Sequence, residues 1–276
     1  MIDSMRSMIR SAGLASRLSP FLARYEKWRL ARFGKLEQRS LSKEVSELVS
    51  ASSDVFRVGP PAHYADMAVS VHELPSLVAS LNVCAPVMRN GVVWDVGGNA
   101  GFYSHLFGLI AGPKGRVFAF EPVPTTFQMM CANLEAAGAK NVTPLNLALS
   151  DQCGVLPISF DPNSDTTSSL ENTQGMTCVN VRVATGDNLV EVGECLQPTM
   201  LKIDIEGHEL KALEGMRQIM AQPQCRAVIC EIHFSILASH GEHQPGVRAR
   251  KMLREAGFDR VIFISRSHLL ATKGRF

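Results

Sequence analysis

The sequence contains no Cys-x-x-Cys pair, although it has seven cysteines among its 276 residues. Paired cysteine spacing is the usual mark of a zinc cluster, and an odd number of cysteines does not complete a disulfide framework. Most of these cysteines fall in predicted strands or helices, where a free Cys acts as a small apolar side chain. We therefore expect the chain to work in a reducing compartment, and we predict a cytoplasmic location.

Long apolar runs are also missing. No run reaches the roughly 20 residues that a membrane-spanning helix needs, and the N-terminus lacks the continuous apolar core of a secretory signal. With 46% apolar and 20% charged residues, the composition is that of an ordinary globular protein. The length fits one large α/β domain, or one such domain plus an extension.

A strong net charge is absent, because the whole chain carries only +2. The charge is nevertheless uneven. Residues 1–40 hold nine Lys and Arg against three Asp and Glu, a net charge of +6, which leaves −4 for the rest. A mildly acidic body argues against broad nucleic-acid binding, so we predict no nucleic-acid partner.

The basic N-terminal segment has a helical pattern, with apolar residues at three- and four-residue spacing between Leu14 and Leu36. One interpretation is a basic amphipathic helix in peripheral contact with an anionic membrane. Another is an extension that packs on its own domain or on a second copy of the chain. A transit peptide is the third. Because Gly59-Pro60-Pro61 marks a break, we predict a helical extension over residues 1–60 and a catalytic domain over residues 61–276.

Beyond this break, strand-like and helix-like segments alternate, which predicts a doubly wound α/β fold with a mostly parallel sheet. The expected strands lie at residues 92–96, 116–120, 143–148, 199–204, 226–232 and 259–264, with an antiparallel edge strand at 268–272. The expected helices lie at residues 73–88, 100–111, 124–137, 207–221 and 245–256. An insertion at residues 153–183 interrupts the pattern with a β-hairpin (155–160 and 177–183), and such insertions commonly shape a substrate pocket.

The first strand leads into the turn Asp95-Val96-Gly97-Gly98-Asn99-Ala100-Gly101, and an amphipathic helix follows. Strand, tight glycine turn and helix start bring a backbone close to a small ligand. Asp95 offers a carboxylate to a cationic or hydroxylated group. About 20 residues further on, Glu121 closes the second strand, where an acid can hydrogen-bond a ribose diol. Both NAD and S-adenosylmethionine fit these features.

The glycine spacing distinguishes between the two candidate cofactors. The dinucleotide fingerprint G-x-G-x-x-G is absent, because Asn99 occupies its middle position. The turn suits S-adenosylmethionine, which has no pyrophosphate to seat on a helix N-terminus, so we interpret the chain as a methyltransferase. Ala148 then lies where the third strand would meet the adenine. An NAD(P)-dependent oxidoreductase and a non-catalytic, membrane-docking protein that binds S-adenosylmethionine are the alternatives.

Acidic residues collect at the ends of two later strands, in Lys202-Ile203-Asp204-Ile205-Glu206 and in Glu231-Ile232-His233. If these strands are neighbours, the two segments converge on one rim, so the candidate catalytic residues are Asp204, Glu206, Glu231 and His233. Such a cluster can take a proton from a hydroxyl or hold a divalent cation that acidifies it.

Simpler interpretations of these residues stay open. Glu206 and Glu209 could offset the dipole of the following helix, and Glu231 with His233 could form a structural pair. His208 is expected to face solvent. We assign no residue as a metal ligand, but an oxygen-rich set would favour magnesium or manganese over zinc.

Taken in order and spacing, these motifs resemble the FkbM-type methyltransferase family over roughly residues 75–265. The motifs are Asp95-x-Gly97-x-Asn99-x-Gly101-x-Tyr103-Ser104, Phe120-Glu121-Pro122, Asn146-x-Ala148-Leu149-Ser150, Ser168-Ser169-Leu170, Leu201-Lys202-Ile203-Asp204-x-Glu206-Gly207-x-Glu209 and Glu231-Ile232-His233.

The resemblance implies a Rossmann-like class I fold with seven strands, which binds S-adenosylmethionine. It implies O-methylation of a small-molecule or glycan hydroxyl, on a sugar, glycolipid, polyketide or similar natural product. It further implies that Glu121 binds the ribose of the cofactor. The residues placed at the methionine part are Asp95, Gly97, Asn99 and Gly101, and we add Tyr103 and Ser104 of the same motif to the cofactor site.

Overall fold

The computed structural model describes residues 75–160, 168–169 and 177–274. The predicted N-terminal extension and the break at Gly59-Pro60-Pro61 lie outside the described residues, as does most of the loop within the insertion. In the part of the chain that is described, no helix combines the length and the apolar character needed to cross a bilayer. All seven cysteines are described, and all are free thiols.

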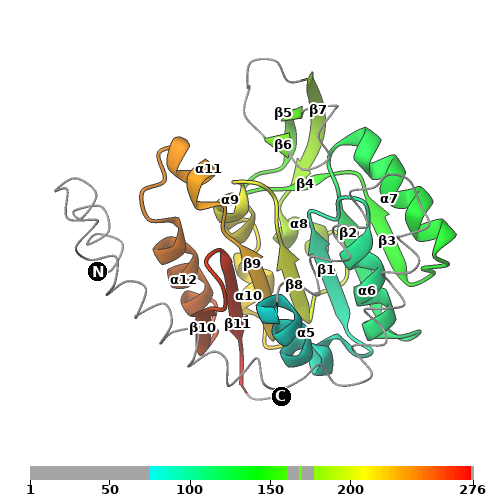
Figure 1. Cartoon of the computed structure of the whole chain (residues 1–276), viewed down its shortest axis with the longest axis horizontal. Coiled ribbons are helices and arrows are strands. Elements are labelled where there is room, and N and C mark those ends of the chain that lie inside the picture. The colour runs from blue at the N-terminus through cyan, green and yellow to red at the C-terminus, as the bar shows by residue number, and fades with distance from the viewer. Residues whose placement is uncertain (1–74, 161–167, 170–176, 275–276) are drawn as a thin grey trace. The chain divides into compact units, whose positions relative to one another are not determined.

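A seven-stranded sheet in the order β10-β11-β9-β8-β1-β2-β3 forms the centre of the domain (Figure 1). Its strands are β1 (Val92–Val96), β2 (Arg116–Phe120), β3 (Val142–Leu145), β8 (Met200–Ile203), β9 (Ala227–Glu231), β10 (Arg260–Phe263) and β11 (His268–Thr272). Neighbours from β3 to β9 pair in parallel, and β11 pairs antiparallel with both β9 and β10. The predicted doubly wound, mostly parallel α/β fold is confirmed.

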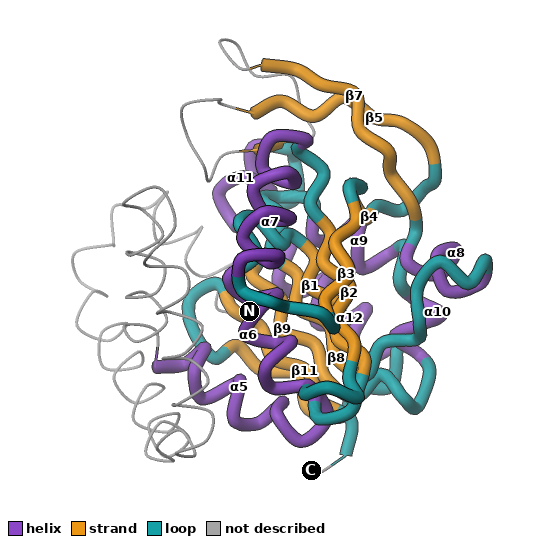
Figure 2. Tube along the Cα trace, turned by 90° about the vertical axis from the view of Figure 1, so that its right-hand side faces the viewer, coloured by secondary structure: helices purple, strands orange, loops and turns teal. Residues whose placement is uncertain are grey.

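Helices cover both faces of this sheet, and Figure 2 shows α5 and α6 on one side with α8 and α10 on the other. The first face carries α5 (Pro75–Met88), α6 (Phe102–Ala111) and α7 (Pro124–Ala136). The second face carries α8 (Gly186–Glu191), α9 (Glu209–Glu214), α10 (Arg217–Ala221) and α12 (Pro245–Glu255). Strand side chains alternate between the two cores, so Val93 packs on the first face and Trp94 on the second.

The same alternation decides where the charged residues of the central strands point. Asp95 lies two positions after Val93, and Lys202 lies two positions after Met200, both of which pack in the core of the α5–α7 face. Glu231 likewise follows Ile229. The three charged side chains therefore share the α5–α7 face, close to the carboxyl edge of the sheet.

The expected edge strand at 268–272 is antiparallel as predicted, but it is not at the edge. It lies between β9 and β10, and β10 forms the edge instead. The physical reason is burial, because Leu269, Leu270 and Ala271 are 0–2% exposed. A strand this apolar gains more free energy between two neighbours than with one side open to water.

The expected strand 143–148 is divided. β3 ends at Leu145, and β4 (Ala148–Leu149) pairs with β7 (Thr177–Ala184) in a second sheet of order β4-β7-β5-β6. The predicted hairpin is confirmed, because β5 (Gly154–Phe160) pairs antiparallel with β7, and β6 (Ser168–Ser169) adds a short strand to β5. The hairpin projects beyond the carboxyl edge of the main sheet (Figure 1).

The expected helix 207–221 is also divided, into α9 and α10. Glu206 and Gly207 have φ angles of 49° and 94°, so the chain makes a left-handed turn before the helix begins at Glu209. The helix then ends at Glu214, and at the next residue, Gly215, an added Cβ would lie 1.9 Å from the carbonyl oxygen of Ser150. Two helices of six residues, α8 and α11 (Phe234–Ser239), were not predicted, because they are too short to show a periodic pattern.

Candidate active site

The glycine turn after β1 folds back on the end of β2. The amides of Gly97 and Gly98 both donate to the carbonyl oxygen of Phe120, at 3.0 and 2.9 Å. Gly97 has a φ of 87°, and a Cβ at this position would lie 1.9 Å from the carbonyl oxygen of Asp204. Glycine is thus required here because the turn packs directly on the end of β8. This contact joins the predicted cofactor turn to the predicted catalytic acids.

Asp95 lies behind the turn and is completely buried, at 0% exposure. Its Oδ2 accepts a hydrogen bond of 2.6 Å from the hydroxyl of Ser104, which is also 0% exposed. Burial raises the pKa of Asp95, while Lys202 and Ser104 act in the opposite direction. In this structure Asp95 and Ser104 support the turn from inside the protein.

Lys202 is the residue of this site that sequence reasoning missed. Its Nζ lies 3.4 Å from Asp95 Oδ1 and 3.3 Å from Asp204 Oδ2, and it donates to the carbonyl oxygen of Gly97 at 3.1 Å. The ammonium also lies 5.2 Å from the centre of the Tyr103 ring. Burial by itself lowers the pKa of Lys202, but Asp204 and Asp95 outweigh it, so the pKa is raised and the group is charged.

Glu121 is held next to the glycine turn by two backbone amides. Its Oε2 accepts from the amide of Asn99 and its Oε1 from the amide of Val123, both at 3.0 Å. The residue is 6% exposed, and burial raises its pKa to about 7. Ala148 lies in β4 and packs in a small apolar cluster with Val123, so its strand reaches the residues that follow Glu121.

Three of the four predicted catalytic residues come together at the carboxyl edge. His233 Nε2 lies 3.3 Å from Glu206 Oε2 and 3.7 Å from Asp204 Oδ1. The side chains of Asp204 and Glu206 keep 30% and 31% of their surface exposed, so a substrate can reach them. The chain does not stay extended between Asp204 and Glu206, yet both carboxylates lie on the same rim as His233. The left-handed turn at Glu206 brings its carboxylate back toward His233.

Glu209 is buried behind this cluster and orients His233. It is 0% exposed, its Oε1 lies 2.6 Å from His233 Nδ1, and the same oxygen accepts from the amide of Gly207 at 2.9 Å. Burial lowers the pKa of His233, but Glu209, Glu206 and Asp204 outweigh it and raise the pKa to about 9. Glu209 does lie in the first turn of α9, as expected, but its carboxylate faces His233. A dipole role alone therefore does not describe it.

The half-buried carboxylates of Asp204 and Glu206 differ in proton affinity. Burial raises the pKa of Glu206 to about 7, against the influence of His233. For Asp204, burial acts upward but Lys202 and His233 outweigh it, so its pKa is lowered. Neighbouring carboxyl groups with separated pKa values are typical of sites that move protons.

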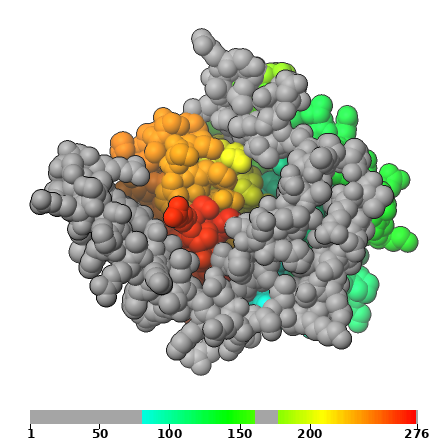
Figure 3. Space-filling view, viewed as in Figure 1, coloured from blue at the N-terminus to red at the C-terminus, as the bar shows by residue number. Residues whose placement is uncertain are grey.

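Glu231 pairs with a different histidine. In the register of β9 and β11 its direct partner is His268, whose Nε2 lies 3.3 Å from Glu231 Oε2. Glu231 Oε1 also accepts from the hydroxyl of Ser267 at 2.9 Å. The residues after β9 and the C-terminal strand pair lie side by side on the surface in Figure 3, in orange and red. Glu231 thus lies outside the His233 cluster, and together with Asp204 it lines a neighbouring cavity.

His208 is only partly exposed and bonds within the protein, which differs from the expectation that it faces solvent. Its Nε2 lies 3.0 Å from the hydroxyl oxygen of Ser150, and burial lowers its pKa to about 4. The imidazole is therefore neutral near pH 7. It connects the start of α9 to the end of β4.

Comparisons with known proteins find similarity to methyltransferases. Residues 95–260, more than half of the chain, match the model of the methyltransferase FkbM domain. The hexuronic acid methyltransferase AglP of Haloferax volcanii is 37% identical over 148 residues, 54% of this chain and 58% of that protein. Methyltransferase 1 of Beauveria bassiana is 28% identical over 152 residues, 48% of this chain and 61% of that protein.

The chain thus spans about three fifths of the length of these two curated relatives. A crystal structure of methyltransferase FkbM from Methylobacillus flagellatus shares 14% identity with this chain. Its TM-score is 0.46, over 88% of this chain and 58% of that one.

Proposed function

Because the chain belongs to the FkbM methyltransferase family, we propose that it is an S-adenosylmethionine-dependent O-methyltransferase. Its acceptor is a hydroxyl of a sugar, glycolipid, polyketide or similar small molecule. The observation that supports this proposal is the contact of Gly97 with the backbone of Asp204, because it brings the glycine turn directly against a half-buried carboxylate. The name of the Haloferax volcanii relative supports a sugar acceptor.

The residues of the turn fit the cofactor. Glu121 has each carboxylate oxygen fixed by one backbone amide, which leaves further lone pairs for the two hydroxyls of a ribose. Gly97, Asn99 and Gly101 would hold the methionine part, and Ala148 the adenine side. We assign Asp95 and Ser104 to the support of this turn, because both are completely buried.

Methyl transfer to a hydroxyl requires two things of this chain: it must orient the methyl donor and the acceptor, and it must accept the hydroxyl proton. A sulfonium methyl group is electrophilic when bound, and its transfer in line to oxygen depends chiefly on proximity and orientation. A hydroxyl is a poor nucleophile at neutral pH, so Asp204 or Glu206 accepts its proton as the new carbon–oxygen bond forms. The bonding electron pair of the broken carbon–sulfur bond stays on sulfur. Lys202 and His233 hold the Asp204 carboxylate in place for this step.

Ligand binding and methyl transfer test the function. Calorimetry of the purified protein should show binding of adenosylhomocysteine and no binding of NADH. Incubation with methyl-labelled S-adenosylmethionine should label a compound in an extract of a strain that lacks this gene. Binding of NADH alone would favour the oxidoreductase alternative. Cofactor binding without labelling of any extract would favour the non-catalytic one.

Cofactor affinity should rise with pH through about pH 7. The ionised Glu121 carboxylate accepts hydroxyl protons, whereas its protonated form must first lose one, and its pKa is raised to about 7. Binding below this pH is therefore linked to proton release, and we expect adenosylhomocysteine to bind about tenfold more weakly at pH 6 than at pH 8.

Glu121→Gln is the control for this effect. It should bind about tenfold more weakly at pH 8, because Gln has one acceptor oxygen for the two amides that Glu121 now satisfies. Its affinity should also lose the dependence on pH. A wild-type protein whose affinity is constant from pH 6 to pH 8 would contradict the ribose role of Glu121.

A divalent cation is a second way to activate the hydroxyl. One ligand atom each from Asp204, Glu206 and His233 lie within 4.8 Å of one another, and Glu209 orients the imidazole as partners of metal-bound histidines do. Lys202 competes, because its ammonium already lies 3.3 Å from Asp204 Oδ2. We therefore expect methyl transfer to persist in a chelator, and a loss of more than tenfold that Mg²⁺ or Mn²⁺ restores would establish the cation.

For residues 1–40 we propose contact with an anionic membrane surface or with a second copy of the chain, on the basis of their +6 charge. Sedimentation with anionic vesicles and the oligomeric state, compared with and without these residues, separate the two. A deletion that leaves both unchanged would contradict the proposal.

A further inference from the structure

A cavity of about 440 Å³ opens beside Asp204 and Lys202, on the face of the sheet that carries α5 and α6. Its volume lies within the range of about 300–1,000 Å³ that small-molecule sites occupy. Asp204 and Lys202 of its lining take part in the chemistry described above, and Tyr103, which the sequence motif assigned to the cofactor site, also lines it. The remaining lining comes from α5, α6, the ends of β8 and β9, the segment that joins β10 to β11, and the first residue of β11.

One wall of this cavity is a connected polar network. Ser267 donates its hydroxyl to Glu231 Oε1 at 2.9 Å, and His268 Nε2 lies 3.3 Å from Glu231 Oε2. The hydroxyl oxygen of Ser265 lies 3.0 Å from His268 Nδ1. These contacts fix the orientation of four polar side chains. The Ser265 hydroxyl is fully used, since it also accepts from the amides of Ser267 and His268, whereas the Ser267 hydroxyl and the Glu231 carboxylate keep further capacity for hydrogen bonds. Such a network suits a ligand with several hydroxyl groups.

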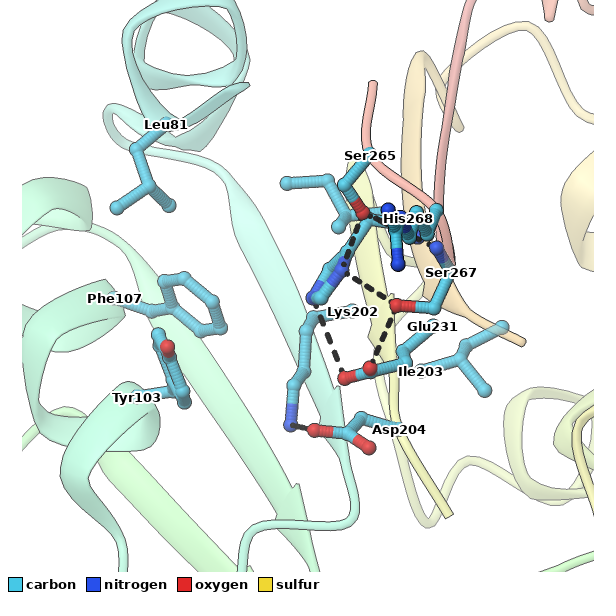
Figure 4. A pocket seen from close by; sticks show the side chains of 12 residues that line it. Leu81, Tyr103, Phe107, Lys202, Ile203, Asp204, Glu231, Ser265, Ser267 and His268 are labelled. Atoms are coloured by element: carbon cyan, nitrogen blue, oxygen red, sulfur yellow. Dashed lines mark hydrogen bonds and ion pairs between the residues drawn. The ribbon is translucent and has the colours of Figure 1, made fainter. Parts of the chain in front are cut away.

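The opposite wall is apolar and aromatic. Figure 4 shows Leu81, Phe107 and Tyr103 across the cavity from Ser265, Ser267, His268 and Glu231. The rings of Tyr103 and Phe107 are 6.0 Å apart between centres, and their planes are inclined by 32°. Asp204 stands at the end of the cavity, between the two walls (Figure 4).

We propose that this cavity is the acceptor site and that it binds a pyranose ring. A pyranose has an apolar C–H face, which matches Tyr103 and Phe107, and a rim of hydroxyls, which matches the Glu231–Ser267–His268 network. An acceptor hydroxyl then lies next to Asp204. A flat lipophilic acceptor would leave the half-buried Ser267 hydroxyl and Glu231 carboxylate without ligand partners, at a cost in binding free energy. This inference rests on the proposed function and adds the class of acceptor and the residues that select it.

Saturation-transfer NMR on the protein saturated with adenosylhomocysteine tests the inference. The probes are methyl β-D-glucopyranoside and methyl β-D-glucuronide, with cyclohexanol as the apolar control. At least one pyranoside should show binding that exceeds cyclohexanol, strongest at the ring C–H protons. Ser267→Ala should weaken this binding about threefold to tenfold, the effect of one lost hydrogen bond. Ser265→Ala, as a second variant, should act in the same direction.

The matched control is Ser239→Ala, which removes an exposed hydroxyl bonded only to the carbonyl oxygen of Ile236 among the described contacts. It should leave pyranoside binding unchanged. The affinity of all three variants for adenosylhomocysteine should equal that of the wild type, which also shows that they fold. Adenosylhomocysteine binding without pyranoside binding, or pyranoside binding unaffected by both cavity serines, overturns the acceptor assignment alone. Failure to bind adenosylhomocysteine overturns the proposed function, and this inference with it.

Discussion

Replacing Lys202 with methionine should lower the free energy of unfolding by about 3–5 kcal/mol, the usual cost of breaking a buried ion pair by removal of one partner. The ammonium compensates Asp95, which is 0% exposed and has no hydrogen bond to its Oδ1. A methionine side chain would fill the space but leave that carboxylate without a counter-charge. The carbonyl oxygen of Gly97 would also lose its donor. Urea unfolding, followed by circular dichroism, measures the change.

A second substitution identifies the cause of this loss. In the double variant Lys202→Met, Asp95→Asn the buried position carries no charge, so part of the lost stability should return. Lys211→Met is the matched control, because Lys211 is exposed on α9 and its replacement should change stability by less than about 0.5 kcal/mol. If Lys202→Met were as stable as Lys211→Met, the ammonium would not be the group that compensates Asp95.

The interaction of Lys202 with Asp95 also shows what the sequence could not reveal. Both residues were visible in motifs, and each lies on an apolar strand whose bounds were predicted to within a residue. Their contact depends on the parallel register of β1 with β8, in which Asp95 and Lys202 are direct partners. The two strands are about a hundred residues apart in the chain. Alternation predicts the face on which a side chain lies, but not its neighbour on the next strand.

The hydrogen-bond network around Glu231 could not be predicted from the sequence for a related reason. An edge strand at 268–272 would have placed His268 far from the middle of the sheet. The insertion of β11 between β9 and β10 is what makes His268 the direct partner of Glu231. By contrast, Asp204, Glu206 and His233 belong to the four residues expected to converge if the two strands were neighbours. β8 and β9 are neighbours, and the structure brings these three together. The turn that achieves it, with a positive φ at Glu206, could not be predicted from residue type.

Asp204→Asn should abolish methyl transfer while cofactor binding persists. A positioned general base typically contributes 10²–10⁴-fold to the rate, so we expect a loss of at least about a hundredfold in turnover. Asparagine keeps the shape of the side chain, and Lys202 keeps Asp95 and the Gly97 carbonyl as partners, so the fold should remain. Adenosylhomocysteine affinity should stay within about threefold of the wild type. The measurement is transfer from labelled donor to the acceptor present in cell extract.

Two further variants are needed to interpret the result for Asp204→Asn. Asp259→Asn, the matched control, alters an exposed carboxylate at the far end of the domain that accepts from the amide of Gly274, and it should retain full activity. Glu206→Gln distinguishes the two candidate bases, because the one that accepts the proton should be the more damaging to lose. Near-normal turnover in Asp204→Asn, with Glu206→Gln inactive, would transfer the role of base to Glu206. Full activity in both would mean that the hydroxyl is activated elsewhere, and the His233 cluster would then only shape the carboxyl edge.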